Sequence, residues 1–415
     1  MSDLRTLLAS SAFPVPDGRM WRVATSWRGP PAQAGYIVGE LTDVLSRKVH
    51  LDLYGPSTAE CTAAGKSMQT VGIVELAQDL LMYRFNAVSG LYSCVFRGPI
   101  GRLDDAITDT THTLTISAGD YRALIARLFY GAAQTFTQTD QATIVAHFVN
   151  ANAVGVAPPR GLGLQFGGVL NPDGSSLGQT TGVLRDRTYT GAELTGTVID
   201  DLSQVINGFD WAALPYDPAV FTPPNALEAN VVVYYPQRGV AKPAFIAEYG
   251  VTVSNVTRSV DSTSFANYVR IDGTNSGGVP LFATSSGDVM TNPQNHPEGL
   301  WPLQASAADV SVTTTLQQQS DGQLALSSQL SPAYTLDLVP GTWNTPADCW
   351  LGDTIELRVK SGRLNVDTFV RIVAMDFDID DSGQERLSLT VGRPPASFVS
   401  LFQQRSSTIE ALTRR

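Results

Sequence analysis

A change in the spacing of apolar residues at Gly119 limits what this chain can fold into. Residues 96–118 read as two strands joined by a polar turn, and the second strand alternates apolar and polar side chains. Beyond Gly119 the apolar side chains recur every three or four positions over residues 121–128, and Asp120 is a natural helix N-cap. A β-region therefore ends at Gly119 and a helical region begins.

The hairpin before Gly119 recurs near the C-terminus. Residues 369–392 align without gaps with residues 96–119, and both stretches carry an acidic turn between two strands. The alignment matches Phe96 with Phe369, Leu114 with Leu387, Ile116 with Leu389 and Gly119 with Gly392. Any two hairpins with alternating apolar residues can align in this way, so coincidence stays open as an alternative. The other interpretation is that one chain carries two copies of one β-domain.

The composition favours a mainly β (α+β) protein of several domains. A chain of 415 residues is long enough for several domains that each bury a core. Apolar residues make up 43% of the sequence and charged residues only 16%, while Thr, Ser, Val, Gly and Pro are plentiful. The low charged share also predicts that uncharged surface is buried between subunits.

Charge and cysteine content exclude several classes of protein. The net charge is −11 and no cluster of Lys and Arg is present, so the chain is a poor candidate for gripping a phosphate backbone. Acidity instead suits a surface past which nucleic acid moves without sticking. Cys61, Cys94 and Cys349 lie far apart without a CxxC pair, which argues against a disulfide framework or a zinc site and for a reducing compartment. The first twenty residues lack the apolar core of a signal peptide, and no stretch is long enough for a membrane span.

Two motifs resemble ligand sites but have simpler interpretations. Asp376, Asp378, Asp380 and Asp381 suggest a calcium loop, yet the required Gly and Glu positions hold other residues. Because three of these carboxylates alternate with apolar residues, we interpret them as the solvent-facing side of a strand. The glycines at 161, 163, 167 and 168 fit a dinucleotide fingerprint poorly, and we expect a flexible or partner-contacting loop there.

No residue pattern indicates catalysis, a cofactor or a metal. The histidines (His50, His112, His147 and His296) are scattered, and none has ligand spacing. Three tryptophans (Trp301, Trp343 and Trp350) could stack on sugars, but burial in a core or an interface is the expected fate of such side chains. We therefore predict a non-enzymatic chain with no catalytic, cofactor-binding or metal-binding residues.

The apolar patterns divide the chain into five parts. We expect an N-terminal arm (1–19), a first β-domain (20–118), an α/β insertion domain (119–240), a second β-domain (241–395) that holds a loop and helix insertion (273–330), and a C-terminal tail (396–415). Helices are predicted at 120–130, 140–153, 198–206 and 306–320, with a further helix in the tail. A strand at 266–271 is assigned to the second β-domain.

Several segments, taken in order, resemble the baseplate hub or minor tail proteins of long-tailed, siphovirus-type bacteriophages. The first half is similar in LDLYGPSTAE, YSCVFRGPIGRLDD and LTISAGDYRALIARLFY. The middle is similar in VLRDRTYTGAELTGTVIDDLSQVINGFDW, and the final β-domain in NVTRSVDSTSFANYVRIDG and WLGDTIELRVKSGRLNVDTFVRIVAMDFDIDDSGQERLSLTVGRP. The resemblance covers most of residues 40–395, without the N-terminal arm, the glycine-rich segment, the loops at 273–303 and the tail.

This resemblance implies two tail-tube-like β-barrel or sandwich domains with an inserted α/β domain. It also implies a homotrimer that adapts the six-fold tail tube to a three-fold tip and lines the channel for genome ejection. The partners implied are the distal tail and tube ring proteins, the tape measure protein, and a central fibre or spike with other tail-tip proteins. DNA would pass without specific binding, and the chain would be a virion structural protein at the tail tip, made in the host cytoplasm. A tail-associated cell-wall or polysaccharide hydrolase and a receptor-binding module for host attachment are the alternatives.

Overall fold

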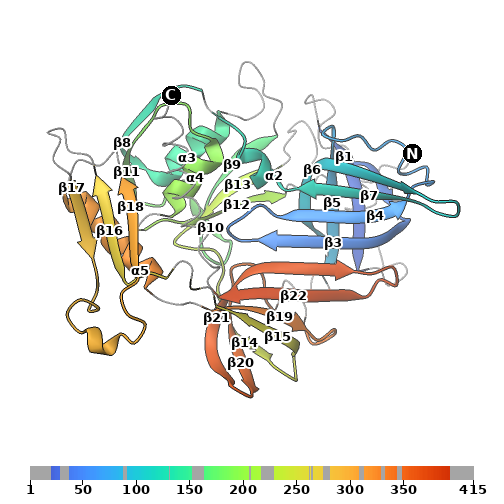
Figure 1. Cartoon of the computed structure of the whole chain (residues 1–415). Helices are drawn as coiled ribbons and strands as arrows, with labels where there is room; N and C mark the ends of the chain where they lie inside the picture. The colour runs from blue at the N-terminus through green and yellow to red at the C-terminus, as the bar shows by residue number, and fades with distance from the viewer. Residues whose placement is uncertain are drawn as a thin grey trace. The chain divides into compact units, whose positions relative to one another are not determined.

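The chain is described here from a computed structural model (Figure 1). The described residues are 20–28, 37–86, 91–129, 131–151, 163–204, 207–215, 229–260, 262, 265–273, 281–307, 313–328, 332–343 and 348–392. The expected N-terminal arm, the C-terminal tail and its helix lie outside these ranges. The structure is mainly β and divides into two compact units, Met1–Val256 with Thr335–Thr390 and Thr257–Tyr334 with Val391–Arg415. The five-part division of the sequence stays a prediction.

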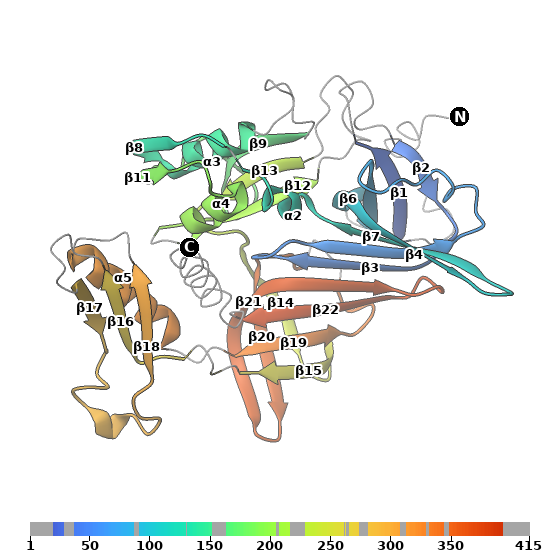
Figure 2. The same cartoon turned by 45° about the horizontal axis from the view of Figure 1, so that its top comes forward.

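One sheet of 13 strands dominates the described fold (Figures 1 and 2). Its early strands are β1 (Trp21–Trp27), β2 (Ile37–Leu41), β3 (Val44–Asp52), β4 (Thr58–Ala64), β5 (Gln78–Asn86), β6 (Leu91–Ile107) and β7 (His112–Gly119). Its late strands are β14 (Ala241–Glu248), β15 (Val253–Ser259), β19 (Ala333–Leu338), β20 (Thr354–Ser361), β21 (Leu364–Ile379) and β22 (Glu385–Gly392). The main path runs β15-β19-β22-β21-β3-β4-β7-β6-β5-β1-β2, and β14 and β20 extend it beside β21.

The strand order repeats within this path. The series β15-β19-β22-β21 is followed by β3-β4-β7-β6, so an early and a late group of four strands lie head to tail. In the early group, the first half of the long strand β6 pairs with β5. In the late group, the first half of the long strand β21 pairs with β20. Strand β7 begins at residue 112 and β22 at residue 385, which is 273 residues later. The two strands also end 273 residues apart, at 119 and 392. The two hairpins therefore occupy equivalent places in one sheet.

The gapless alignment is correct for part of each hairpin only. Leu114 and Ile116 are buried, and so are their counterparts Leu387 and Leu389. Phe96 is buried, however, whereas Phe369 is 61% exposed. A β-bulge in β6 between Ile100 and Arg102 shifts the register, and such a bulge changes which side chains face the core. A gapless match therefore does not hold along the whole of β6 and β21.

One face of the four-strand groups is apolar and the other is polar. On β3, Val49 and Leu51 are buried while Lys48 is exposed, as strand alternation requires. On β21 the buried Phe377 packs edge-on against Trp21, with ring centroids 5.3 Å apart. Each such buried side chain contributes about 1.5–3 kcal/mol relative to an exposed one. This burial fixes which face of the sheet is left polar.

The chain leaves the sheet at Gly119, as the apolar spacing predicts. Asp120 caps α2 (Tyr121–Ile125) by accepting a hydrogen bond from the Ala123 backbone N–H. The helix is shorter than predicted, because after Ala126 the backbone turns and the Leu128 carbonyl accepts a bond from the Thr195 N–H. The apolar Leu124 and Leu128 still pack against a buried apolar cluster that includes Tyr121 and Ile125.

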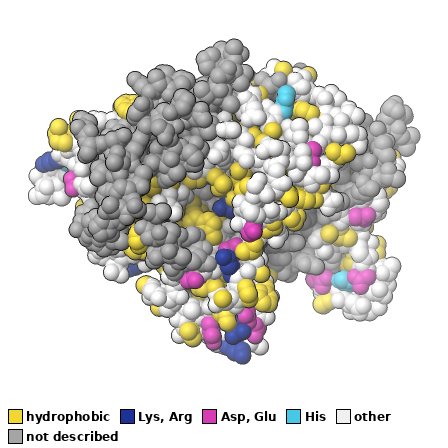
Figure 3. All heavy atoms as spheres, turned by 180° about the vertical axis from the view of Figure 1, so that it is seen from behind, with side chains coloured by type: hydrophobic (Ala, Val, Ile, Leu, Met, Phe, Trp, Pro, Cys, Tyr) yellow, Lys and Arg dark blue, Asp and Glu magenta, His cyan; other side chains and the backbone are white. Residues whose placement is uncertain are grey.

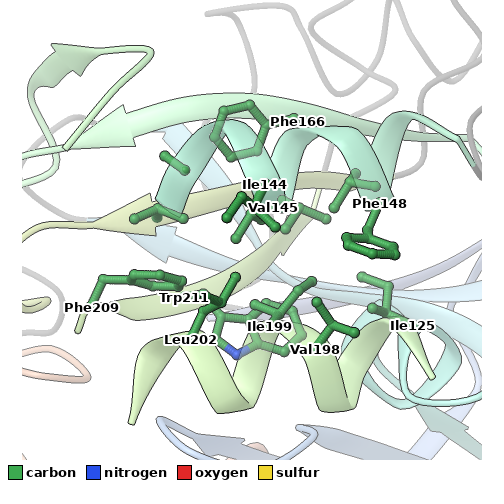
Figure 4. Close-up of a cluster of buried hydrophobic side chains, with 14 of the residues drawn as sticks. Ile125, Ile144, Val145, Phe148, Phe166, Val198, Ile199, Leu202, Phe209 and Trp211 are labelled. Carbon is green, nitrogen blue, oxygen red and sulfur yellow. The ribbon is translucent and has the colours of Figure 1, made fainter. Parts of the chain in front are cut away.

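The region after α2 forms a small α/β layer with its own core (Figure 4). Helices α3 (Gln141–Asn150) and α4 (Thr195–Ser203) face each other through Phe148, Ile199 and Leu202 in Figure 4. Their sheet has the order β10-β9-β13-β12, and a separate pair joins β8 (Gln134–Asp140) to β11 (Leu184–Tyr189). The four strands are β9 (Leu164–Leu170), β10 (Ser176–Gly178), β12 (Asp210–Pro215) and β13 (Ala229–Tyr234).

The described part of the second compact unit contains a three-stranded sheet and the helix α5. Strand β16 (Tyr268–Gly273) confirms the predicted strand, but its partners are β17 (Leu281–Ser285) and β18 (Pro302–Ala307) rather than the large sheet. Helix α5 (Thr313–Ser327) begins later than predicted because residues 302–307 already belong to β18. A short 3-10 turn, η2 (Pro293–Asn295), lies between β17 and β18. None of the helices in the described ranges combines the length and apolar character that a membrane crossing requires.

Candidate functional site

The polar face of the large sheet is hollowed into a groove of about 1130 Å³. Both four-strand groups contribute to it: Lys48 and Glu60 from the early group, and Asp376 and Arg386 from the late group. These side chains stand on the polar face because their neighbours along each strand are buried in the core. The groove therefore crosses the junction at which β3 pairs with β21.

The groove is nearly balanced in charge, although the chain as a whole is acidic. Its charged lining consists of the carboxylates Glu60, Asp337, Asp376 and Asp378 and the cations Lys48, Arg102 and Arg386, with His50 beside them. On the molecular face in Figure 3, described acidic and basic side chains are likewise scattered among uncharged ones. Neither a basic clamp for phosphates nor a strongly acidic surface lines this groove.

His50 forms the best-defined ionic contact of the groove. Its Nδ1 lies 2.6 Å from Asp376 Oδ1 across the β3–β21 junction, and its Nε2 lies 3.7 Å from Asp52 Oδ2. The hydrogen bond to Asp376, followed by the one to Asp52, raises the pKa of His50 to about 10. Burial alone would raise the pKa of Asp52, but bonds from His50 and from the Gly55 and Tyr54 backbone hold it below the ordinary value. A protonated His50 brings the groove lining close to neutrality.

The remaining acidic and glycine motifs have structural roles in the described chain. Asp376 and Asp378 lie on the polar face of β21, as predicted. Asp380 organises the β21–β22 turn, where its Oδ1 accepts bonds from the Ser382 and Gln384 N–H groups. Gly167 and Gly168 lie within β9, so the expectation of a loop at that point is wrong. Among described residues, no group of three or more His, Cys, Asp or Glu side chains is placed to hold a metal ion.

The remaining histidines and the three tryptophans, for which the sequence predicts no site, are dispersed. His112 contacts Asp105 in the β6–β7 hairpin, and His296 lies between Asp288 and Glu298 in the second unit. His147 packs on α3 against Phe136. Trp301 is 46% exposed, while Trp343 and Trp350 are half-buried.

The cysteines do not form disulfides in this structure. Cys61, Cys94 and Cys349 each keep the thiol form. Burial raises the pKa of Cys61 to about 12, and burial with nearby carboxylates does the same for Cys349. Both thiols therefore stay protonated and unreactive at neutral pH.

Sequence reasoning missed the two ends of the repeated sheet. Within the described chain, β21 is covered along Ala374–Ile379 by β3, but no strand covers the equivalent stretch Gly101–Ile107 of β6. At the opposite end, β15 pairs with β19 on one side and terminates the path. β15 holds the place in the late group that β3 holds in the early group. The 273-residue offset is a sequence signal for the repeated hairpin, but β3 and β15 begin 209 residues apart, at 44 and 253, so the offset does not locate these edges.

Comparisons with known proteins agree on the fold. No protein-family model matches the sequence, and no curated protein matches it either. A 43 kDa tail protein of prophage MuSo2 from Shewanella oneidensis is 12% identical over 89% of this chain and 98% of its own, with a TM-score of 0.56. A tail protein from Neisseria meningitidis MC58 is also 12% identical with a TM-score of 0.56, over 90% of this chain and 96% of its own. Prophage tail protein gp18 from Listeria monocytogenes EGD-e is 16% identical over 94% of this chain and 99% of its own, with a TM-score of 0.53. Over nearly its whole length, this chain has the fold of prophage tail proteins.

Proposed function

We propose that the chain is a structural, non-enzymatic protein of a phage tail: a homotrimeric baseplate hub whose groove faces the channel. The observation that carries this proposal is the pair of complementary open edges on one repeated sheet. The β3–β21 pairing inside the chain is a template for joining β6 of one copy to β15 of the next. Such a head-to-tail contact generates a closed ring when the rotation closes, and closure would pair the edges of β6 and β15 that are open in a single copy.

Three copies would place six four-strand groups around one axis. Each chain contributes two groups in the same head-to-tail order. If copies join as the two groups do, successive groups would be related alike within and between copies. A six-fold tube could then dock on one side of the ring and a three-fold fibre or spike on the other. The hub would act as a symmetry adaptor at the virion tail tip, next to tail tube ring proteins.

The charge of the groove lining is suited to a channel through which DNA and the tape measure protein pass without binding. Its balanced charge would attract neither DNA nor the tape measure protein strongly, and the polar side chains keep the surface wet. The net charge of the chain predicts an acidic channel lining that repels DNA. The lining of this groove is nearly neutral, so near-neutrality takes the place of that explanation. Genome ejection would then meet little electrostatic resistance along this stretch.

The oligomeric state of the full chain tests the proposal. Sedimentation velocity over a wide concentration range should resolve a trimer, and electron microscopy of that species should show a ring with an axial opening. A matched assay on host cell walls, with a known lysozyme as positive control, should show no hydrolysis. A chain that stays monomeric at every concentration, or one that degrades cell walls, contradicts the hub.

A further inference from the structure

We propose that the β4–β5 loop, residues 65–77, is a contact surface for a second copy of this chain, beside the open edge of β6. This inference rests on the proposed trimer and names one of its contacts. The loop belongs to the early strand group and connects the polar-faced part of the sheet to β5.

The loop displays an unusual amount of apolar surface. Met68 is 87% exposed, Val71 74% and Leu76 70%, and Val74 is 44% exposed between them. Single exposed aliphatic side chains are common, but four within nine residues form a concentrated patch. A patch of this kind on a tail protein fold is best explained by burial in an assembly.

The exposure is not the result of a loose loop. Gln69 exchanges hydrogen bonds with Thr42, and the Ser67 hydroxyl donates to Asp43 at 3.0 Å. The Gln78 side-chain amide donates to the Gly72 carbonyl at 2.8 Å. Leu76 adopts a φ of 62°, a left-handed conformation that costs a leucine free energy. The fold thus holds the apolar side chains outward at some cost.

The loop lies where the uncovered edge of β6 begins. The Leu76 N–H donates to the Ile100 carbonyl at 2.8 Å, and the open stretch Gly101–Ile107 follows directly. A strand that pairs with this stretch must therefore pass next to Leu76.

The late strand group shows what covers the equivalent loop. Between β19 and β20, the Gly352 N–H donates to the Ile372 carbonyl at 2.9 Å, as Leu76 does to Ile100. The next carbonyl, that of Val373, accepts a bond from the Leu53 N–H, and from there β3 covers β21. In this loop Leu351 is only 5% exposed.

Side chains of the early strands β3 and β5 border this late loop. Trp350 and Leu351 line a pocket together with Leu51 and Arg84, and the Arg84 guanidinium lies 5.4 Å from the Trp343 ring centroid. The early loop has no such cover within the described chain, since the group that would follow it belongs to another copy. The occupant is therefore the β15 end of a second copy, which stands in the place of β3.

Charge and cysteine variants test this contact. Val71→Asp and Met68→Asp should each raise the concentration for half-assembly at least about tenfold, because a carboxylate would be buried without a partner. Leu177→Asp, at a 45% exposed leucine of β10, is the matched control and should assemble as the wild type does. In a Cys94→Ser background, Met68→Cys should react with a maleimide at least about tenfold more slowly in the trimer than in the dissociated chain.

A change at Leu76 separates the contact from a role in folding alone. Leu76→Gly relieves the positive φ, so it should stabilise the monomer while it weakens the trimer. A trimer that forms normally with the aspartate variants, and whose Met68→Cys thiol stays fully reactive, overturns the loop contact and leaves the hub intact. A wild-type chain that never forms a trimer overturns both.

Discussion

His50 and Asp376 face each other across the junction between the two strand groups, with Nδ1 and Oδ1 2.6 Å apart. The contact fixes the register of β3 against β21. A slip of one residue would place His50 opposite Met375 and turn the apolar side chains toward the groove. The pair therefore helps to specify the one register that the proposed contact between copies must imitate.

The contribution of His50 to stability should disappear at alkaline pH. Its pKa is raised from 6.5 to about 10 by the hydrogen bonds to Asp376 and Asp52, so the folded state holds a proton that the unfolded state releases. The stabilisation is complete below pH 6.5 and is lost as the pH rises through about 10. Because the side chain is 37% exposed, His50→Gln should cost only about 0.5–1 kcal/mol of unfolding free energy at pH 6. Urea denaturation at pH 6, 8 and 10.5 measures the difference.

His112→Gln is the matched control, since His112 also contacts a carboxylate but lies in the β6–β7 hairpin away from the junction. The same measurement on this variant gives the effect of losing a histidine–carboxylate contact outside the junction. If the difference between wild type and His50→Gln is the same at pH 6 and pH 10.5, the ion pair does not stabilise the junction.

A buried ionic cluster ties the first strands to α2, and breaking it should be costly. Asp79 is fully buried and accepts bonds from Arg97 Nε at 2.9 Å and from the Tyr121 hydroxyl at 2.6 Å. Asp79→Asn should lower the unfolding free energy by about 3–5 kcal/mol, because a buried guanidinium loses its counter-charge. Tyr121→Phe removes one bond only and should cost about 1–2 kcal/mol. Chemical denaturation that ranks the two variants in the opposite order would contradict this account.

A close backbone approach at Gly98 predicts a clear steric effect. A Cβ added there would lie 2.0 Å from the Gly119 carbonyl oxygen, at the point where the chain leaves the sheet. Gly98→Ala should therefore destabilise the fold by about 3 kcal/mol or more. Gly101→Ala, in the same strand with nothing within 4 Å of the new Cβ, should change stability by less than about 0.5 kcal/mol. Equal melting temperatures for the two variants would rule out the clash.

Local chemistry explains which elements the sequence predicts well. The sequence predicts Asp120 as a helix N-cap, and its side chain accepts the bond of an N-cap from the Ala123 N–H, as Asp140 does from the Ala142 N–H. The alternation in β7 and β22 is strict because one face of each strand is buried. In both cases the signal lies within a few residues of the feature that it predicts.

Features that depend on distant strands were not predictable in this way. The bulge after Ile100 and the burial of Phe96 but not Phe369 follow from which strands lie alongside, and periodicity carries no such information. The sequence predicts strand β16 but not its partners, which lie with it in a separate sheet. The open edges likewise emerge only from the complete strand order, although the repeat that creates them is visible in the sequence.

Blocking the open edge of β6 should abolish assembly while sparing the fold. The Thr108 N–H donates to the Thr111 carbonyl, so by the alternation of an antiparallel hairpin the Ile107 N–H points away from β7, toward the open edge. Ile107 is 72% exposed, and Ile107→Pro removes that donor at little cost in burial. Sedimentation velocity should therefore show a folded monomer for Ile107→Pro and a trimer for the control Ile107→Thr, which keeps the N–H. If both variants form trimers equally well, copies do not join through this edge. The β3–β21 pairing would then not be a model for the contact between copies.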